Sequence, residues 1–66
     1  MSVAKVIELT SDSETSFDDA LRQGIRKAAK TLSGIKGAWI ADQEVMVENG
    51  EVQGYRVHFR VTFVLD

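Results

Sequence analysis

Residues 52–65 of the chain, VQGYRVHFRVTFVL, alternate apolar and polar side chains over most of their length. From Tyr55 onward every second residue is aromatic or aliphatic, and most of the residues between are charged or polar. Such a period of two is typical of a strand with one buried and one wetter face. Asn49-Gly50, just before this stretch, is a strong signal for a two-residue hairpin turn. We therefore predict an antiparallel hairpin whose other strand is Ala38–Glu48.

The last strand is long for a protein of 66 residues. Residues 52–65 would span about 46 Å at about 3.3 Å per residue. A compact domain of this length has a diameter of only roughly 28 Å. The strand must therefore bend, with Gly54 the expected place, or lie against other subunits. Because an uncovered edge of that length promotes aggregation, we expect the chain to be a building block of a larger assembly.

Composition supports the same expectation. The chain makes one domain, residues 1–66, and a domain this small buries only roughly 60% of its unfolded surface. Small folds compensate with disulfides, a structural metal or oligomerisation. The sequence has no cysteine and a single histidine, His58, which excludes disulfides and argues against a thiolate or His-rich metal site. Oligomerisation is the remaining source of stability.

The charge and hydropathy patterns restrict the partners. A net charge of −2 and a pI of about 5.2 give no electrostatic reason to expect a nucleic acid. No apolar run approaches the ~20 residues of a membrane span, and the N-terminus lacks the apolar core of a signal peptide. We expect a cytoplasmic protein with no nucleic-acid or membrane partner.

A strand and a helix are predicted before the hairpin. Val3–Thr10 is rich in β-branched and aliphatic residues and predicts a strand, followed by a polar turn over residues 11–15. Ser16 is a good helix N-cap, and apolar residues follow at spacings of three and four up to a C-terminal cap at Gly34. The other side of this helix is basic and either faces solvent or meets phosphates of a ligand. Its side chains are those of Arg22, Arg26, Lys27 and Lys30.

The order and spacing of these elements resemble those of the dodecins. The motifs that carry the resemblance are VIELT at 6–10, SFDDA at 16–20, AAKTL at 28–32, YRV at 55–57 and VTFVL at 61–65. The resemblance implies an α+β fold of order β-α-β-β, with a three-stranded antiparallel sheet wrapped round one helix. It also implies a homododecamer that closes into a hollow shell.

Dodecins are known for binding flavins, so the resemblance implies FMN or riboflavin as the ligand. Paired flavin rings stack between tryptophans of two subunits and are hydrogen-bonded by a glutamine. Without a gap, the family tryptophan falls at Gly37, two residues before Trp39, and the family glutamine falls at Arg56. Arginine accepts no hydrogen bond and does not reproduce the amide. A dodecin subgroup that lacks this tryptophan, and includes calcium-binding members, also has arginine after the tyrosine, so calcium is the alternative ligand.

The hairpin turn predicts which side chains face each other. With a two-residue loop at residues 49–50, residues whose numbers sum to 99 lie opposite each other. The predicted pairs are Trp39–Arg60, Gln43–Arg56 and Ala41–His58.

From this pairing we predict four ligand-binding residues: Trp39, Arg56, Gln43 and His58. Trp39 is either a stacking platform at a cavity between subunits or an aromatic buried between subunits against an arginine. Arg56 and Gln43 either contact the ligand or form a cross-strand polar pair. His58 either binds a ligand or packs in an interface.

The sequence shows no catalytic constellation, because no nucleophile is paired with a base and no glycine-rich phosphate loop is present. We therefore predict that the chain is not an enzyme, and we assign no metal ligand within one chain. Three carboxylates alternate along the second strand, and they either face solvent or gather calcium around a symmetry axis. They belong to Asp42, Glu44 and Glu48.

The predicted function is a dodecin-like shell of twelve subunits that binds or stores a small ligand, flavin first, at subunit interfaces. The alternative is a structural or calcium-binding cage that has lost flavin binding. A third hypothesis is an adaptor that recruits another protein through its edge strand.

Overall fold

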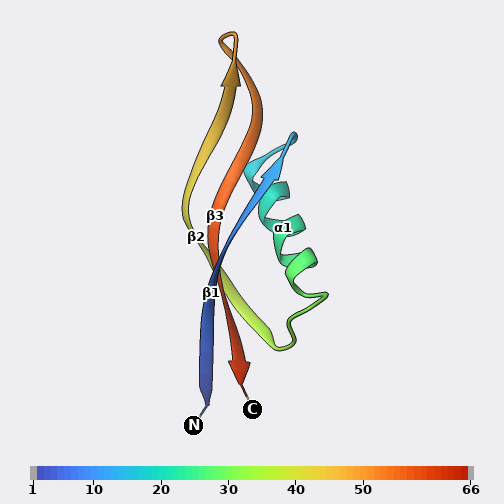
Figure 1. The fold of residues 1–66 in the computed structure, drawn as a ribbon, viewed down its shortest axis with the longest axis vertical. Coiled ribbons are helices and arrows are strands. Elements are labelled where there is room, and N and C mark those ends of the chain that lie inside the picture. The colour runs from blue at the N-terminus through green and yellow to red at the C-terminus, as the bar shows by residue number, and fades with distance from the viewer. Residues whose placement is uncertain (1, 66) are drawn as a thin grey trace.

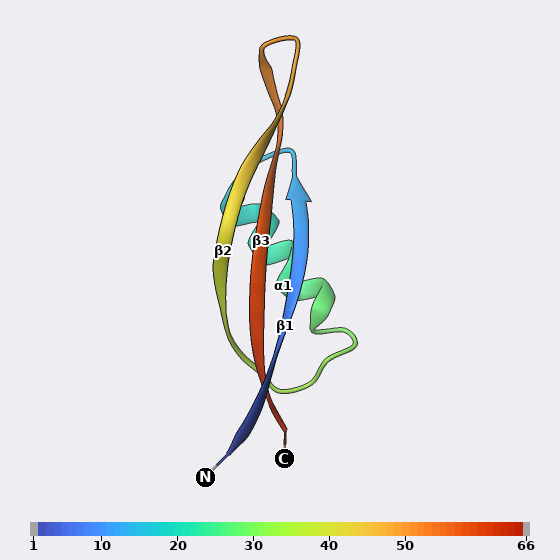
Figure 2. The same cartoon turned by 60° about the vertical axis from the view of Figure 1, so that its left-hand side comes forward.

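The structure, a computed structural model, describes residues 2–65 and contains one helix and three strands. The elements are β1 (Val3–Ser13), α1 (Phe17–Ala28), β2 (Ile35–Glu48) and β3 (Glu51–Leu65). The strands form one antiparallel sheet in the order β1-β3-β2, with α1 along one of its faces (Figure 1). Figure 2 shows the three strands side by side. The predicted α+β fold of order β-α-β-β is confirmed.

The molecule is elongated. It measures 51 × 20 × 13 Å, and its radius of gyration of 13.6 Å exceeds the value of about 11 Å for a compact domain of this length. The last residue pair of β1 with β3 is Ser13–Tyr55, so β2 and β3 continue beyond it without a third strand. We call this two-stranded extension, residues 46–54, the arm. It projects past the N-terminal end of α1 (Figure 1).

The arm ends in the predicted turn. Asn49 and Gly50 both have positive φ, at 52° and 76°, which is the conformation of a two-residue hairpin turn whose twist matches that of the flanking strands. The predicted Asn-Gly turn is confirmed.

β1 is longer than its composition indicated. Residues 11–13, predicted as part of a polar turn, pair with residues 55–57 of β3. Polar side chains are accommodated here because they find partners at the end of the strand. The Ser13 hydroxyl donates to the Asp19 carboxylate at 2.6 Å and accepts from the Thr15 N–H at 2.9 Å. Ser13 thus belongs both to β1 and to the turn that follows it, which explains why residues 11–13 have the composition of a loop.

The start of α1 is confirmed and its predicted end is wrong. The Ser16 side chain caps the helix by accepting from the Asp19 N–H at 2.9 Å. The helix ends at Ala28, six residues before Gly34. Gly34 instead turns the chain into β2 with a φ of 79°, and its carbonyl accepts from the Val64 N–H at 3.0 Å. Glycine suits both a helix cap and this turn, because both require positive φ.

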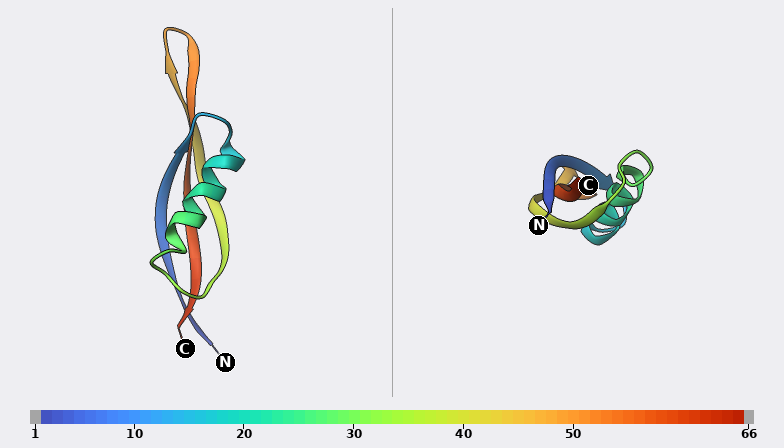
Figure 3. Two further views of the ribbon diagram at one scale, coloured as in Figure 1. Left: turned by 90° about the vertical axis from the view of Figure 1, so that its right-hand side faces the viewer. Right: turned by 90° about the horizontal axis from the view of Figure 1, so that it is seen from below.

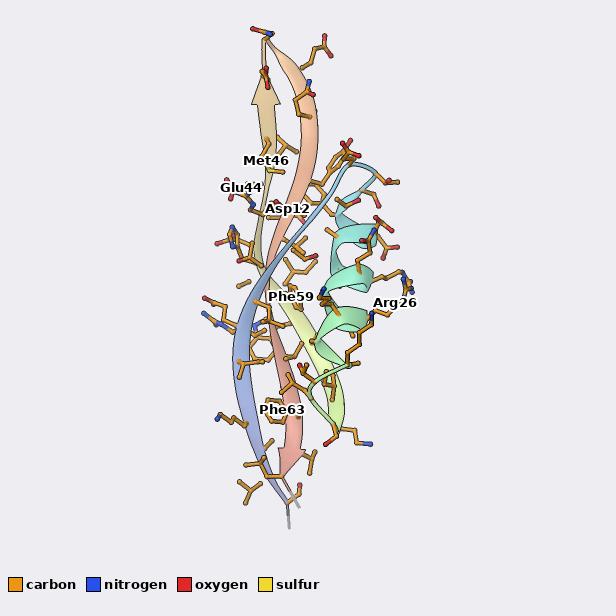
Figure 4. All side chains as sticks on the ribbon, turned by 45° about the vertical axis from the view of Figure 1, so that its right-hand side comes forward. Asp12, Arg26, Glu44, Met46, Phe59 and Phe63 are labelled. Atoms are coloured by element: carbon orange, nitrogen blue, oxygen red, sulfur yellow. The ribbon has the colours of Figure 1, made fainter. Side chains whose placement is uncertain are left out.

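The core lies between α1 and the middle of the sheet. Within residues 2–65 four buried apolar side chains form one cluster, and partly buried apolar residues surround them (Figure 4 shows Phe59 between sheet and helix). The buried ones belong to Ala20, Val57, Phe59 and Val61. Gly24 of α1 allows the helix to approach closely, since a Cβ at this position would lie 2.6 Å from the Phe59 ring.

The helix covers the sheet only in part. It packs mainly on β1 and β3, and it lies along the sheet at an angle that leaves β2 to one side (Figure 3). Ile40 of β2 is in register with the buried Phe59, yet 39% of it is exposed. β2 therefore presents apolar surface that one subunit does not bury. At 12 residues, α1 is too short to cross a membrane, and residues 2–65 contain no other helix.

Candidate functional site

The face of the sheet opposite α1 carries a row of charged and polar side chains. β3 turns its core residues toward the helix, so the alternate residues Arg56, His58 and Arg60 lie on the opposite face. Each is matched by a polar residue of β1 in register. We call the whole row, with one carboxylate from β2, the polar strip. It comprises Glu8, Thr10, Asp12, Glu44, Arg56, His58 and Arg60.

Arg56 is held by a two-bond contact. Its Nε and Nη2 donate to the two carboxylate oxygens of Asp12 at 2.7 and 3.0 Å, and Nη1 lies 3.8 Å from Glu44 Oε1. The hydrogen bond from Arg56 lowers the pKa of Asp12, and the same bond raises the pKa of Arg56. This fork geometry uses the side of the guanidinium that would otherwise meet a ligand carboxylate or phosphate.

His58 connects both edges of the sheet. Its Nδ1 lies 3.0 Å from the Thr10 hydroxyl on β1, and its Nε2 lies 3.0 Å from Glu44 Oε1 on β2. Asp42 Oδ1 is farther away, at 3.7 Å. Because a carboxylate only accepts, Nε2 donates to Glu44. Both ring nitrogens are therefore engaged within the subunit.

Trp39 lies opposite Arg60, as the hairpin pairing predicted. The Arg60 guanidinium donates to Glu8 Oε2 at 2.9 Å on the far strand, away from the indole. Within residues 2–65 Trp39 forms no aromatic pair, and 45% of it is exposed. It is a large flat apolar surface at an edge strand.

Gln43 does not face Arg56, and that predicted pair is wrong. Gln43 is in register with the buried Val57, which places it on the helix side of the sheet, and Glu44 takes the position opposite Arg56. The predicted partner of His58 is also wrong, since Asp42 and not Ala41 is opposite it. The cause is a shift in register between Ile40 and Asp42, where β2 has an extra residue.

The structure therefore brings three of the four predicted residues, Trp39, Arg56 and His58, to one face and puts Gln43 on the other. The acidic partners from β1 were missed. A signal for them exists, because Glu8, Thr10 and Asp12 are spaced by two and match the polar residues of β3 in reverse order. The match can be recognised only when it is known that β1 pairs with β3.

The carboxylates of β2 do not form a metal centre in one subunit. Within residues 2–65 no group of three His, Asp or Glu side chains is placed so that it could hold a metal ion. Glu44 is already shared between His58 and Arg56. A calcium ion prefers six to eight oxygen ligands, so a site on this face would need oxygens beyond these carboxylates, from water or from a second subunit.

Comparison with known proteins agrees with this architecture. A family model described as Dodecin matches residues 3–66. Calcium dodecin of Mycobacterium tuberculosis is 30% identical over 63 residues, which make up 96% of this chain and 89% of that protein. Its crystal structure, described as having a novel calcium-binding site, matches with a TM-score of 0.84 at 28% identity and covers 97% of this chain and 91% of that chain.

Two further solved structures are similar over nearly their whole length. Dodecin from Streptomyces davaonensis has a TM-score of 0.92 at 25% identity, and the match covers 98% of this chain and 96% of that one. A mutant of Thermus thermophilus dodecin has a TM-score of 0.93 at 26% identity, with 100% and 98% covered. The family resemblance read from the sequence is confirmed.

Proposed function

The chain belongs to the dodecin family, and on this premise we propose that it forms a homododecameric shell that binds a flavin at contacts between subunits. Family membership makes it a ligand-binding protein and not an enzyme, as predicted. The ligand proposed first is FMN or riboflavin, stacked on Trp39. Its role would be storage, with a reactive ring screened from solvent.

Assembly is supported by the amount of apolar surface that one subunit leaves open. Within residues 2–65, eight large apolar side chains are between 39% and 63% exposed, whereas five apolar residues are buried. Exposed apolar patches of this kind mark interaction surfaces. The exposed side chains are those of Val3, Val6, Trp39, Ile40, Val45, Val47, Val52 and Leu65.

The flavin proposal is carried by one observation, the exposed indole of Trp39 on an edge strand. A flat electron-poor ring gains from stacking on such a surface. The amide that the family uses has no counterpart on this face, because Arg56 is bound to Asp12 and Gln43 lies on the helix side. Stacking would therefore supply most of the affinity, and we expect weaker binding than an additional amide contact would give.

Titration of riboflavin or FMN with the protein tests this proposal. We expect quenching of flavin fluorescence that Trp39→Ala abolishes and Trp39→Phe reduces, since phenylalanine keeps a smaller stacking surface. Ile40→Ala is the matched control, because it removes a similarly exposed side chain from the other face of the same strand. Absence of quenching at micromolar flavin by the assembled protein would refute the flavin site.

Calcium is the second candidate, and the 30% identity to calcium dodecin favours it. Asp42 and Glu44 supply carboxylate oxygens on the same face as Trp39. If calcium raises the melting temperature and flavin does not, the calcium-binding cage replaces the flavin shell. The rise should disappear in Asp42→Asn, whereas Glu14→Gln, at the β1–α1 turn, should leave it unchanged.

A further inference from the structure

The charges of the subunit are separated along the chain. Residues 20–41, which include most of α1 and the start of β2, contain five positive side chains and no negative one. Residues 42–55, which include the arm, contain four negative side chains and no positive one. The subunit therefore has a basic surface and an acidic projection, although its net charge is only −2.

A groove runs between α1 and the edge strand β1. It has a volume of about 460 Å³, and its walls include Leu9 and Ser11 of β1 and Lys27 and Thr31 near the end of α1, over Phe59. Lys27 also borders a second hollow on the helix surface that is lined by basic side chains. These are Arg26, Lys27 and Lys30, with Gln23 beside them. The groove thus combines an apolar floor with a basic rim; Arg26 lies on the outer side of the helix (Figure 4).

The arm has the complementary properties. Val47 and Val52 are 59% and 50% exposed on it, and Glu48 and Glu51 flank its turn. No third strand pairs with the arm within residues 2–65, so at least half of each of these two side chains is open to solvent. An apolar ribbon with free edges and an acidic tip requires a partner with apolar and basic surface.

We propose that the arm of one subunit docks into the α1–β1 groove of a second copy of the chain. This inference rests on the proposed assembly and names one of its contacts. The register puts Val47 and Val52 on one face of the arm and Glu48 and Glu51 on the other. The valines would lie toward the apolar floor, and the glutamates, on the open side of the groove, would meet the basic rim near Lys27 and Lys30. The contact joins two different surfaces, so it is head-to-tail, and repetition in a closed arrangement builds rings and shells.

Charge reversal on each side tests the contact. Glu48→Lys with Glu51→Lys changes the net charge from −2 to +2, and Lys27→Glu with Lys30→Glu changes it from −2 to −6. All four residues are exposed, so the fold should persist, which far-UV circular dichroism checks. We expect each double variant to require roughly tenfold more subunit to reach the wild-type mass in light scattering, because like charges then meet at the contact.

The variant that combines all four substitutions gives the decisive comparison. It has the wild-type net charge and opposite charges at the contact, so we expect assembly at close to the wild-type concentration. A general effect of net charge is thereby distinguished, because it predicts no shift for Glu48→Lys with Glu51→Lys, whose charge of +2 has the wild-type magnitude, and weaker assembly for Lys27→Glu with Lys30→Glu alone. If the wild type assembles and both doubles assemble equally well, the docking inference is wrong and another occupant fills the groove. A monomeric wild type would overturn the shell and this contact together.

Discussion

The close approach of α1 to the sheet depends on Gly24, and its replacement by alanine gives a sharp test of the packing. A Cβ at position 24 would lie 2.6 and 2.8 Å from Phe59 Cζ and Cε1 and 2.9 Å from Ser11 Cβ. Relaxed carbon contacts are about 3.5–4.0 Å, so the helix or the ring must move by about 1 Å. Phe59 is fully buried and cannot swing into solvent.

Two effects of opposite sign determine the size of the change. Alanine stabilises a helix interior by about 1 kcal/mol relative to glycine. Overpacking of a filled core costs about 1–3 kcal/mol. We therefore expect Gly24→Ala to lower the free energy of unfolding by about 1 kcal/mol, and hence to lower Tm by roughly 4–8 °C in a chain of this size. Thermal unfolding must be compared at one subunit concentration, because the proposed assembly would make Tm concentration-dependent.

Two further variants isolate the cause. Gly37→Ala is the matched control, because nothing lies within 4 Å of a Cβ there and its φ is not positive; Tm should stay the same or rise. In a Phe59→Leu background the ring atoms Cζ and Cε1 are absent, so Gly24→Ala should lower the free energy of unfolding by less than it does in the native background. The coupling energy between the two substitutions should be about 0.5–3 kcal/mol. If Gly24→Ala raises Tm in the native background, as in an open helix, the proposed close packing is wrong.

Two other side-chain contacts give predictions of their own. Ser16→Ala removes the acceptor of the Asp19 N–H and should destabilise the protein by about 1 kcal/mol in thermal melts, whereas Ser16→Asp should retain the cap; equal melting of wild type and Ser16→Ala would contradict this. Asp12 has a pKa lowered from 3.8 by its hydrogen bond from Arg56, so its contribution to stability is present above the unfolded pKa and is lost as pH falls through the folded pKa. The difference in Tm between wild type and Asp12→Asn should therefore shrink as pH is lowered from about 5, and a difference that stays constant would show that the ion pair does not act.

The elements that could be predicted are those whose signal is local. Ser16 caps the helix through its own side chain, and Asn49-Gly50 determines a turn through its own backbone, so both were found. The end of β1 was missed because distant residues set it, and the end of α1 was missed because Gly34 suits a turn into β2 as well as a helix cap. Residues 11–13 join the sheet because β3 continues alongside them, although their composition alone favours a turn.

The site shows the same limit at the level of single residues. The residue numbers of each pair between β2 and β3 sum to 99 next to the turn. They sum to 100 from Met46–Gly54 to Asp42–His58, and again to 99 at Trp39–Arg60. Two irregularities thus cancel, and only for that reason is the predicted opposition of Trp39 and Arg60 confirmed.

Between the two irregularities, the shift of one residue exchanges the faces of β2, because strand side chains alternate with a period of two. Gln43 turns toward the helix side and Glu44 turns toward Arg56 and His58. The extra residue of β2 is Ala41, an ordinary strand residue that gives no local signal. The extra residue of β3 is Gln53, next to Gly54, where a bend was predicted. Their consequence is chemical. The position opposite Arg56 holds a carboxylate and not an amide, so this face is better suited to binding cations than to hydrogen-bonding the edge of a flavin. The proposed flavin binding would therefore depend on Trp39, and the comparison of flavin and calcium titrations decides between the two proposed ligands.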